Sequence, residues 1–209
     1  MYLVSRFKFF SVLFVLFAAS GMVLYVYPKP SPAVIPADIS HLPPVEVGDW
    51  VLRMGTETDS RLIRQLGGGN YSHIGMVVKL QPQIMVLHAT NEEGRNKQNQ
   101  VLLTPLSEFV SQDVATRYAL ARPQFLDTAD KQSIAEQLMH TLGQPFVLAK
   151  RNESHLYCTT LLYEQIKIRY PAFSPQWQTV TAPLFEGEYL FPEAFANYPE
   201  IDWVYISNG

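Results

Sequence analysis

The sequence contains one cysteine, Cys158, and five histidines. A single cysteine cannot form an internal disulfide, so its side chain is either a small buried group or a reactive thiol. Cys158 stands at the start of a predicted helix, residues 157–169, where unpaired backbone N–H groups and the helix dipole stabilise a thiolate. A nucleophile of this kind needs a base nearby. The histidines are the candidates for that base.

Three of the five histidines are weak candidates. His41 lies in a proline-rich segment, and His140 lies in a long predicted helix, where a solvated or half-buried ring is expected. His155 precedes Cys158 by three residues and a loop would let it reach the thiol. Residues 152–154, however, have the composition of an ordinary polar loop, so His155 is not favoured.

His73 and His88 are better placed. His73 opens a predicted strand, residues 73–80, directly after a loop of small residues. His88 lies in the next predicted strand, residues 84–90. If the two strands pair as a hairpin, one ring can orient the other, as the third group does in a nucleophile, base and orienter set. We therefore predict Cys158, His73 and His88 as catalytic residues.

Two alternatives to a role in thiol chemistry remain for the strand histidines. Either the two rings simply pack across the strands, or they hold one zinc ion with Cys158 as third ligand and water as fourth. The sequence has no short His-x-His or His-x-x-x-His pair. Metal binding therefore ranks below thiol chemistry, and no cofactor is expected.

The elements that would position these residues belong to one α+β domain over residues 45–209. The long helix has an expected cap at Asp127 and apolar residues every fourth position, and Gly143 ends it. The predicted strands are 50–54, 73–80, 84–90, 101–104, 117–122 and 203–206. The predicted helices are 59–66, 105–110, 127–142 and 157–169.

The N-terminal segment, residues 1–27, is predicted to be a membrane anchor. Nineteen residues from Phe9 to Tyr27 carry no charge, and as a helix they span roughly 28 Å. Arg6 and Lys8 precede the run, which predicts a single-pass protein of the bacterial inner membrane with its domain in the periplasm. The alternative is a signal peptide cleaved near Ser20, which would release the domain into the periplasm. The length of the run favours the anchor.

Residues 28–44 hold six of the fifteen prolines and are predicted to form a stiff, extended linker. The chain has 16 Lys and Arg residues against 19 Asp and Glu residues, a net charge of −3. Because neither sign forms a long block, a nucleic-acid-binding surface is not expected.

Several short motifs along the chain resemble a known family. They are Gly48-Asp49 before a strand, Asn70-Tyr71-Ser72-His73-Ile74-Gly75 opening the next strand, and Tyr157-Cys158-Thr159-Thr160-Leu161 opening a helix. In this order they resemble the permuted NlpC-type papain-like enzymes, in particular the bacterial amidase-like branch called YiiX/YebB-like. The resemblance covers residues 45–206 and implies a circularly permuted papain-like domain.

In that family the histidine comes first along the chain, then a polar third residue, then the cysteine. The resemblance puts His73 and Cys158 on the first and last of these positions, and His88 on the third-residue position, where relatives often carry glutamate. It implies a thiol hydrolase that cleaves an amide or ester bond through an acyl-enzyme. The Cys158 backbone N–H would stabilise the oxyanion, with Tyr71 as a candidate second donor.

The substrates that the resemblance implies are cell-wall peptides or lipid-linked amides, although no residue identifies the acyl group. Two further classes of function stay open. One is a non-catalytic module that binds a peptide or lipid and has an inert Cys158. The second is a scaffold that uses the anchor to recruit partners. The joint presence of Cys158, His73 and His88 favours the enzyme.

Overall fold

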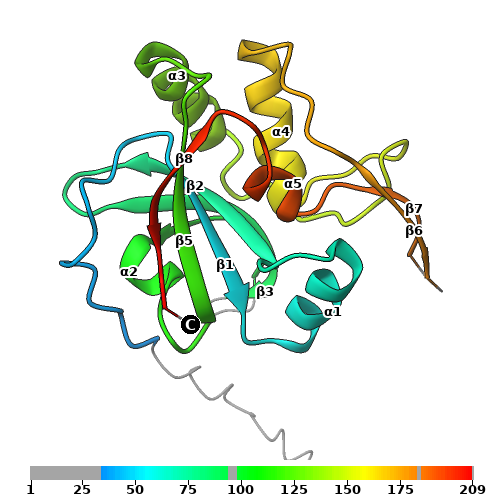
Figure 1. Ribbon diagram of the computed structural model, residues 1–209, viewed down its shortest axis with the longest axis horizontal. Coiled ribbons are helices and arrows are strands. Elements are labelled where there is room, and N and C mark those ends of the chain that lie inside the picture. Colours follow the sequence, from blue (N-terminus) through cyan, green and yellow to red (C-terminus); the bar gives the residue numbers. More distant parts are fainter. Residues whose placement is uncertain (1–33, 94–97, 183–184, 209) are drawn as a thin grey trace, which may run out of the picture. The chain divides into compact units, whose positions relative to one another are not determined.

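A computed structural model describes residues 34–93, 98–182 and 185–208. Its main feature is a six-stranded antiparallel sheet with strand order β4-β3-β2-β1-β5-β8, accompanied by helices and a separate β6-β7 hairpin (Figure 1). The predicted α+β class is confirmed. The strands are β1 (Trp50–Gly55), β2 (His73–Lys79), β3 (Met85–Glu93), β4 (Gln98–Pro105), β5 (Ala115–Pro123), β6 (Gln178–Ala182), β7 (Phe185–Tyr189) and β8 (Ile201–Ile206). The helices are α1 (Thr58–Gly67), α2 (Leu106–Phe109), α3 (Thr128–Met139), α4 (Cys158–Arg169) and α5 (Glu193–Ala196).

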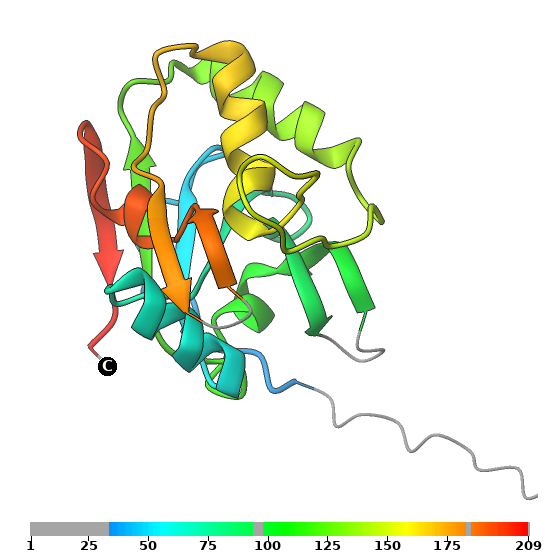
Figure 2. The same ribbon diagram turned by 90° about the vertical axis from the view of Figure 1, so that its right-hand side faces the viewer.

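The sheet has two differently covered faces, because successive side chains of a strand point to opposite sides. Trp50 and Leu52 of β1 belong to the large apolar cluster beneath α3 and α4, which pack on each other and on β2 (Figures 1 and 2). Val51 of β1 and Val77 of β2 belong to a second cluster, together with Phe109 of α2. We call these two sides the α4 face and the α2 face.

The long predicted helix is present as α3 but is shorter than expected. Asp127 caps it as predicted, since its carboxylate accepts a hydrogen bond from the Asp130 N–H at 2.8 Å. The helix ends at Met139 instead of Leu142. Leu142 is 48% exposed, so its apolar spacing does not reflect burial against the sheet.

The β6-β7 hairpin and the short helix α5 were not predicted. The hairpin strands have five residues each, and β7 alternates charged residues with Gly187, so neither gives a strong apolar pattern. Val180 and Tyr189 of the hairpin pack with Ile63 and Leu66 of α1 in a third cluster. The hairpin is therefore stabilised by tertiary contacts with α1.

The described part of the predicted linker lies on the domain, which corrects the prediction of a spacer over its whole length. The Ala37 N–H donates to the Ser107 carbonyl at 2.8 Å, and the Ser111 hydroxyl donates to the Ile35 carbonyl at 2.6 Å. Ile39 and Leu42 pack against the apolar cluster of the α2 face. Covering this cluster removes apolar surface from water, which explains why a proline-rich segment stays bound to the domain.

The predicted anchor, residues 1–27, lies outside the described residues, as does the linker up to residue 33. Among the residues that the structure describes, no helix combines the length and hydropathy needed to cross a membrane.

Candidate active site

The two strand histidines are joined by a hydrogen bond. His73 Nε2 lies 2.9 Å from His88 Nδ1, and the two ring planes are nearly perpendicular at 89°. The contact follows from the antiparallel pairing of β2 with β3, in which Met76 is opposite Leu87. His73 is half-buried at the start of β2, and His88 is 1% exposed.

A glycine makes this approach of the two strands possible. Gly75 lies on the same face of β2 as His73. A β-carbon at Gly75 would lie 2.5 Å from Val86 Cγ1 and 3.2 Å from His88 Cβ. A larger residue would clash with Val86 and crowd His88, which gives the His-x-Gly spacing a physical reason.

The second nitrogen of His88 bonds to the next strand. His88 Nε2 lies 2.9 Å from the Thr104 hydroxyl. Thr104 pairs with Val86, two residues from His88, so the contact runs diagonally across β3 and β4 on one face of the sheet. Both ring nitrogens of His88 are thus engaged.

A buried arginine lies beside His73 on the side away from His88. Arg53 of β1 is opposite His73 in the β1-β2 register and is 2% exposed. Its guanidinium lies 4.3 Å from the centre of the Phe109 ring, and its Nη1 donates to the Phe109 carbonyl at 2.9 Å. Arg53, His73, His88 and Thr104 form what we call the polar row, which crosses four neighbouring strands on the α2 face.

Phe109 of α2 covers the middle of the polar row. Its ring centre lies 5.6 Å from that of His73 and 4.9 Å from that of His88. Phe109 is fully buried, so it keeps water from this side of both rings. A low local dielectric strengthens the electrostatic interactions among them.

This environment lowers the pKa of His73 well below its usual value of 6.5. Burial is the main cause, followed by the charge of Arg53 and then by His88. His73 is therefore neutral at pH 7, the form in which imidazole accepts a proton. Removing an arginine and two histidines from water is costly, and an apolar row would fill the same space, so the polar row is a candidate functional site.

Cys158 is the first residue of α4, as predicted. The helix start is fixed by neighbouring groups: the Tyr157 N–H donates to the Thr160 hydroxyl at 2.9 Å, and the Thr159 hydroxyl donates to the Leu190 carbonyl at 2.7 Å. The Cys158 side chain is 7% exposed. This position places the thiol at the N-terminal, positive end of the α4 helix dipole.

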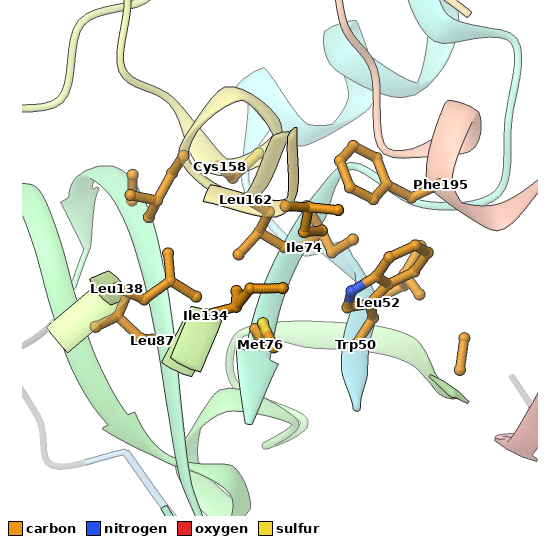
Figure 3. Packing of buried hydrophobic residues seen from close by; sticks show 14 of the residues in the cluster. Trp50, Leu52, Ile74, Met76, Leu87, Ile134, Leu138, Cys158, Leu162 and Phe195 are labelled. Carbon is orange, nitrogen blue, oxygen red and sulfur yellow. The ribbon is translucent and has the colours of Figure 1, made fainter. Parts of the chain in front are cut away.

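The structure places Cys158 and His73 at the same end of β2 but on different faces. Cys158 belongs to the apolar cluster of the α4 face, and in Figure 3 it lies near Leu162 on the side of Ile74 away from Met76. That is the end at which His73 begins the strand. Since Ile74 points to the α4 face, the His73 ring points to the α2 face, where it meets Phe109. The structure thus brings His73 and His88 together on the α2 face. The Cys158 thiol lies near the same end of β2 but on the α4 face.

The remaining histidines lie elsewhere. His41 Nε2 lies 3.2 Å from the Tyr118 hydroxyl and 3.1 Å from the Tyr205 hydroxyl, so it helps hold the linker on the domain. His140 is exposed at the end of α3. His155 Nδ1 lies 3.4 Å from the Lys150 carbonyl, and its ring packs against Tyr157 and Trp177.

The candidate second oxyanion donor, Tyr71, is 8% exposed and its ring stacks on Trp203, with centres 6.1 Å apart. Burial raises the pKa of its hydroxyl, and the carboxylate of Glu193 raises it further. Tyr71 therefore stays protonated and able to donate a hydrogen bond at neutral pH.

Three members of the site were missed by sequence reasoning: Arg53, Thr104 and Phe109. Arg53 carried a signal, since a charge inside the apolar run Trp50–Met54 needs a buried partner. Thr104 and Phe109 are ordinary residues for a strand and a helix, and only the β3-β4 register and the packing of α2 show their place.

A comparison with solved structures identifies a protein of the same fold. This is YiiX from Escherichia coli O157:H7, described as a metalloprotein of DUF1105, with a TM-score of 0.64 and 18% sequence identity. The similarity covers 78% of this chain and 97% of the YiiX chain. No family model and no curated protein matches the sequence. The chain therefore shares the α+β fold of YiiX.

Proposed function

We propose that this protein is a papain-like thiol hydrolase in which Cys158 is the nucleophile and His73 the base. The observation that supports the proposal is the hydrogen bond between His73, the first residue of β2, and His88. Helix α4, which begins at Cys158, packs on the same strand. Because Nε2 of His73 is bonded to His88, the thiol would meet Nδ1. The fold shared with YiiX is compatible with this class of hydrolase.

The proposed reaction begins with transfer of the Cys158 proton to Nδ1 of His73, at the end of β2 where His73 lies. The thiolate attacks the carbonyl carbon of an amide, and the backbone N–H of Cys158 at the helix start stabilises the oxyanion. His73 then returns its proton to the leaving amine, which departs and leaves an acyl-enzyme. Water, deprotonated by His73, releases the acid and restores the thiol.

The proposed substrates are amides of cell-wall peptides or of lipids, with the protein tethered to the inner membrane and its domain in the periplasm. This part rests on the resemblance and on the apolar run of residues 9–27. A tethered protein would keep its N-terminal segment and stay with membranes through a carbonate wash. An intact mass that shows cleavage near Ser20 would favour the secreted form.

YiiX is described as a metalloprotein, which raises the question of whether this chain binds a metal. Within the described ranges, no group of three or more His, Cys, Asp and Glu side chains is placed to hold a metal ion. His73 and His88 bond directly to each other, and the next group along, Thr104, is a poor metal ligand. The residues of the site therefore do not fit a three-ligand metal centre, and thiol chemistry is the better proposal.

Alkylation of the single cysteine tests the proposal without a known substrate. We expect iodoacetamide to modify Cys158 once in the folded protein, at a rate already near its plateau at pH 7. His73→Ala should move the midpoint of the rate upward, towards the value of about 8.5 for an ordinary thiol. His140→Ala, which changes an exposed histidine, is the matched control and should leave the midpoint unchanged.

Two results would reject the enzyme. A thiol that reacts only after denaturation is a structural cysteine, and a thiol with the same midpoint near 8.5 in wild type and His73→Ala is a bystander. Either result would favour a peptide- or lipid-binding module on the same fold.

A further inference from the structure

The polar row is a chain of hydrogen bonds whose direction decides what His73 can do. In one direction, His73 Nε2–H donates to His88 Nδ1 and His88 Nε2–H donates to the Thr104 hydroxyl. In the other, Thr104 donates to His88 and His88 donates to His73. Only the first direction leaves Nδ1 of a neutral His73 without a proton, and only that form accepts a proton from a thiol.

The two ends of the polar row favour the first direction. Arg53 and His88 flank His73 from neighbouring strands on opposite sides, β1 and β3. A neutral imidazole has a dipole whose positive end is its N–H group. The nearby cation of Arg53 therefore favours the tautomer whose N–H points away from it, towards His88. At the far end, the Thr104 hydroxyl oxygen lies 2.9 Å from His88 Nε2 and can accept the hydrogen bond from the proton on that nitrogen.

We propose that Arg53 and Thr104 are positioning residues that orient this hydrogen-bond chain and so hold His73 with Nε2 protonated and Nδ1 bare. Neither residue touches the reacting atoms. Arg53 acts on His73 through its charge, and Thr104 acts through His88 by accepting a hydrogen bond. The inference rests on the proposed function for its purpose, because a bare Nδ1 is the nitrogen that the thiol would need.

The tautomers can be read directly by NMR. The experiment uses the full-length chain with ¹⁵N-labelled histidine and two-bond ¹⁵N–¹H correlation spectra at pH 7.5, with His88→Asn to assign the resonances. We expect both His73 and His88 to show a bare Nδ1 and a protonated Nε2. Protonation of His88 on Nδ1 in the wild type would overturn the proposal.

Variants of Thr104 test its part. Thr104→Ser keeps the hydroxyl and should keep the wild-type spectrum. Thr104→Val has nearly the same shape without an acceptor, so the His88 Nδ1 resonance should move towards that of a protonated nitrogen. The alkylation rate of Cys158 at pH 7 should fall about 3- to 10-fold, as expected for the loss of one hydrogen bond. Thr179→Val, on an exposed position of β6, is the matched control.

A Thr104→Val spectrum identical to wild type would overturn the role of Thr104. Should that variant fail to fold, the wild-type tautomers and the Thr104→Ser spectrum still decide the direction of the chain. The result is separate from the proposed function, because the spectra can be repeated in Cys158→Ala. The tautomers can be as proposed while the midpoint of Cys158 alkylation is the same in wild type and His73→Ala. That result would reject the thiol hydrolase and leave the proposed orientation of the polar row intact.

Discussion

The two faces of the sheet are built from alternate residues of the same strands and yet have opposite chemistry. On the α4 face, Trp50, Leu52 and Ile74 form part of the large apolar core. On the α2 face, the residues next to them include Arg53 and His73, which are polar and held by hydrogen bonds and a cation–ring contact. The difference shows that alternate residues of β1 and β2 have different roles. Those on the α4 face are apolar and form the larger core, whereas those on the α2 face include ionisable groups held in fixed positions beside a smaller apolar cluster.

The largest expected effect breaks the α4 face. Trp50 is fully buried, with its ring centre 5.1 Å from that of Phe195. Trp50→Ala should lower the free energy of unfolding by about 3–5 kcal/mol, measured by denaturant titration. Trp203→Ala, at a position 39% exposed, is the matched control and should lose much less stability.

A smaller effect is expected when the α2 face loses His88. His88→Ala should lower turnover of any amide that the protein cleaves by about 10- to 100-fold, or about 1.4–2.7 kcal/mol, because His73 loses the group that orients it. Unfolding should stay cooperative. His73→Ala should lower turnover further, since it removes the base itself. Equal turnover in wild type and His88→Ala would remove His88 from the mechanism.

How far each face could be predicted from sequence follows from the range of its contacts. The hairpin of β2 and β3 is local, so the neighbouring positions of His73 and His88 followed from strand pattern alone. The start of α4 at Cys158 was also local. Arg53 and Thr104 enter through β1 and β4, whose register with the hairpin depends on the whole sheet. The docked linker from Ile35 onward likewise depends on an apolar surface that its own residues do not reveal.

A third prediction concerns the charge at the end of the polar row. Arg53→Met removes the cation that disfavours protonation of His73, so the pKa of His73 should rise and the acid limb of the alkylation profile should move to higher pH. Arg53→Lys keeps a charge and should move the limb less. The Phe109 carbonyl loses a donor in the Met variant, so thermal unfolding of both variants is the control for structural damage. An unchanged acid limb in Arg53→Met would exclude an electrostatic role.

The smallest effect is a dependence of stability on pH. The pKa of His73 in the folded protein lies well below the value of 6.5 expected in the unfolded chain. As the pH falls through 6.5, the unfolded chain therefore binds a proton that the folded protein does not, and stability decreases. One proton contributes at most about 1.4 kcal/mol per pH unit, and the contribution levels off below the folded pKa.

His73→Asn should remove this dependence. Denaturant titrations at several pH values between 7.5 and 5 should show a smaller loss of stability on acidification in His73→Asn than in wild type. His140→Asn, at an exposed position, should behave like wild type and serves as the control. Because both variants keep every carboxylate, the difference between wild type and His73→Asn reports on His73 and its hydrogen-bond partner His88. Parallel curves for wild type and His73→Asn would mean that the α2 face tolerates a protonated imidazole, and the polar row would then not hold His73 neutral.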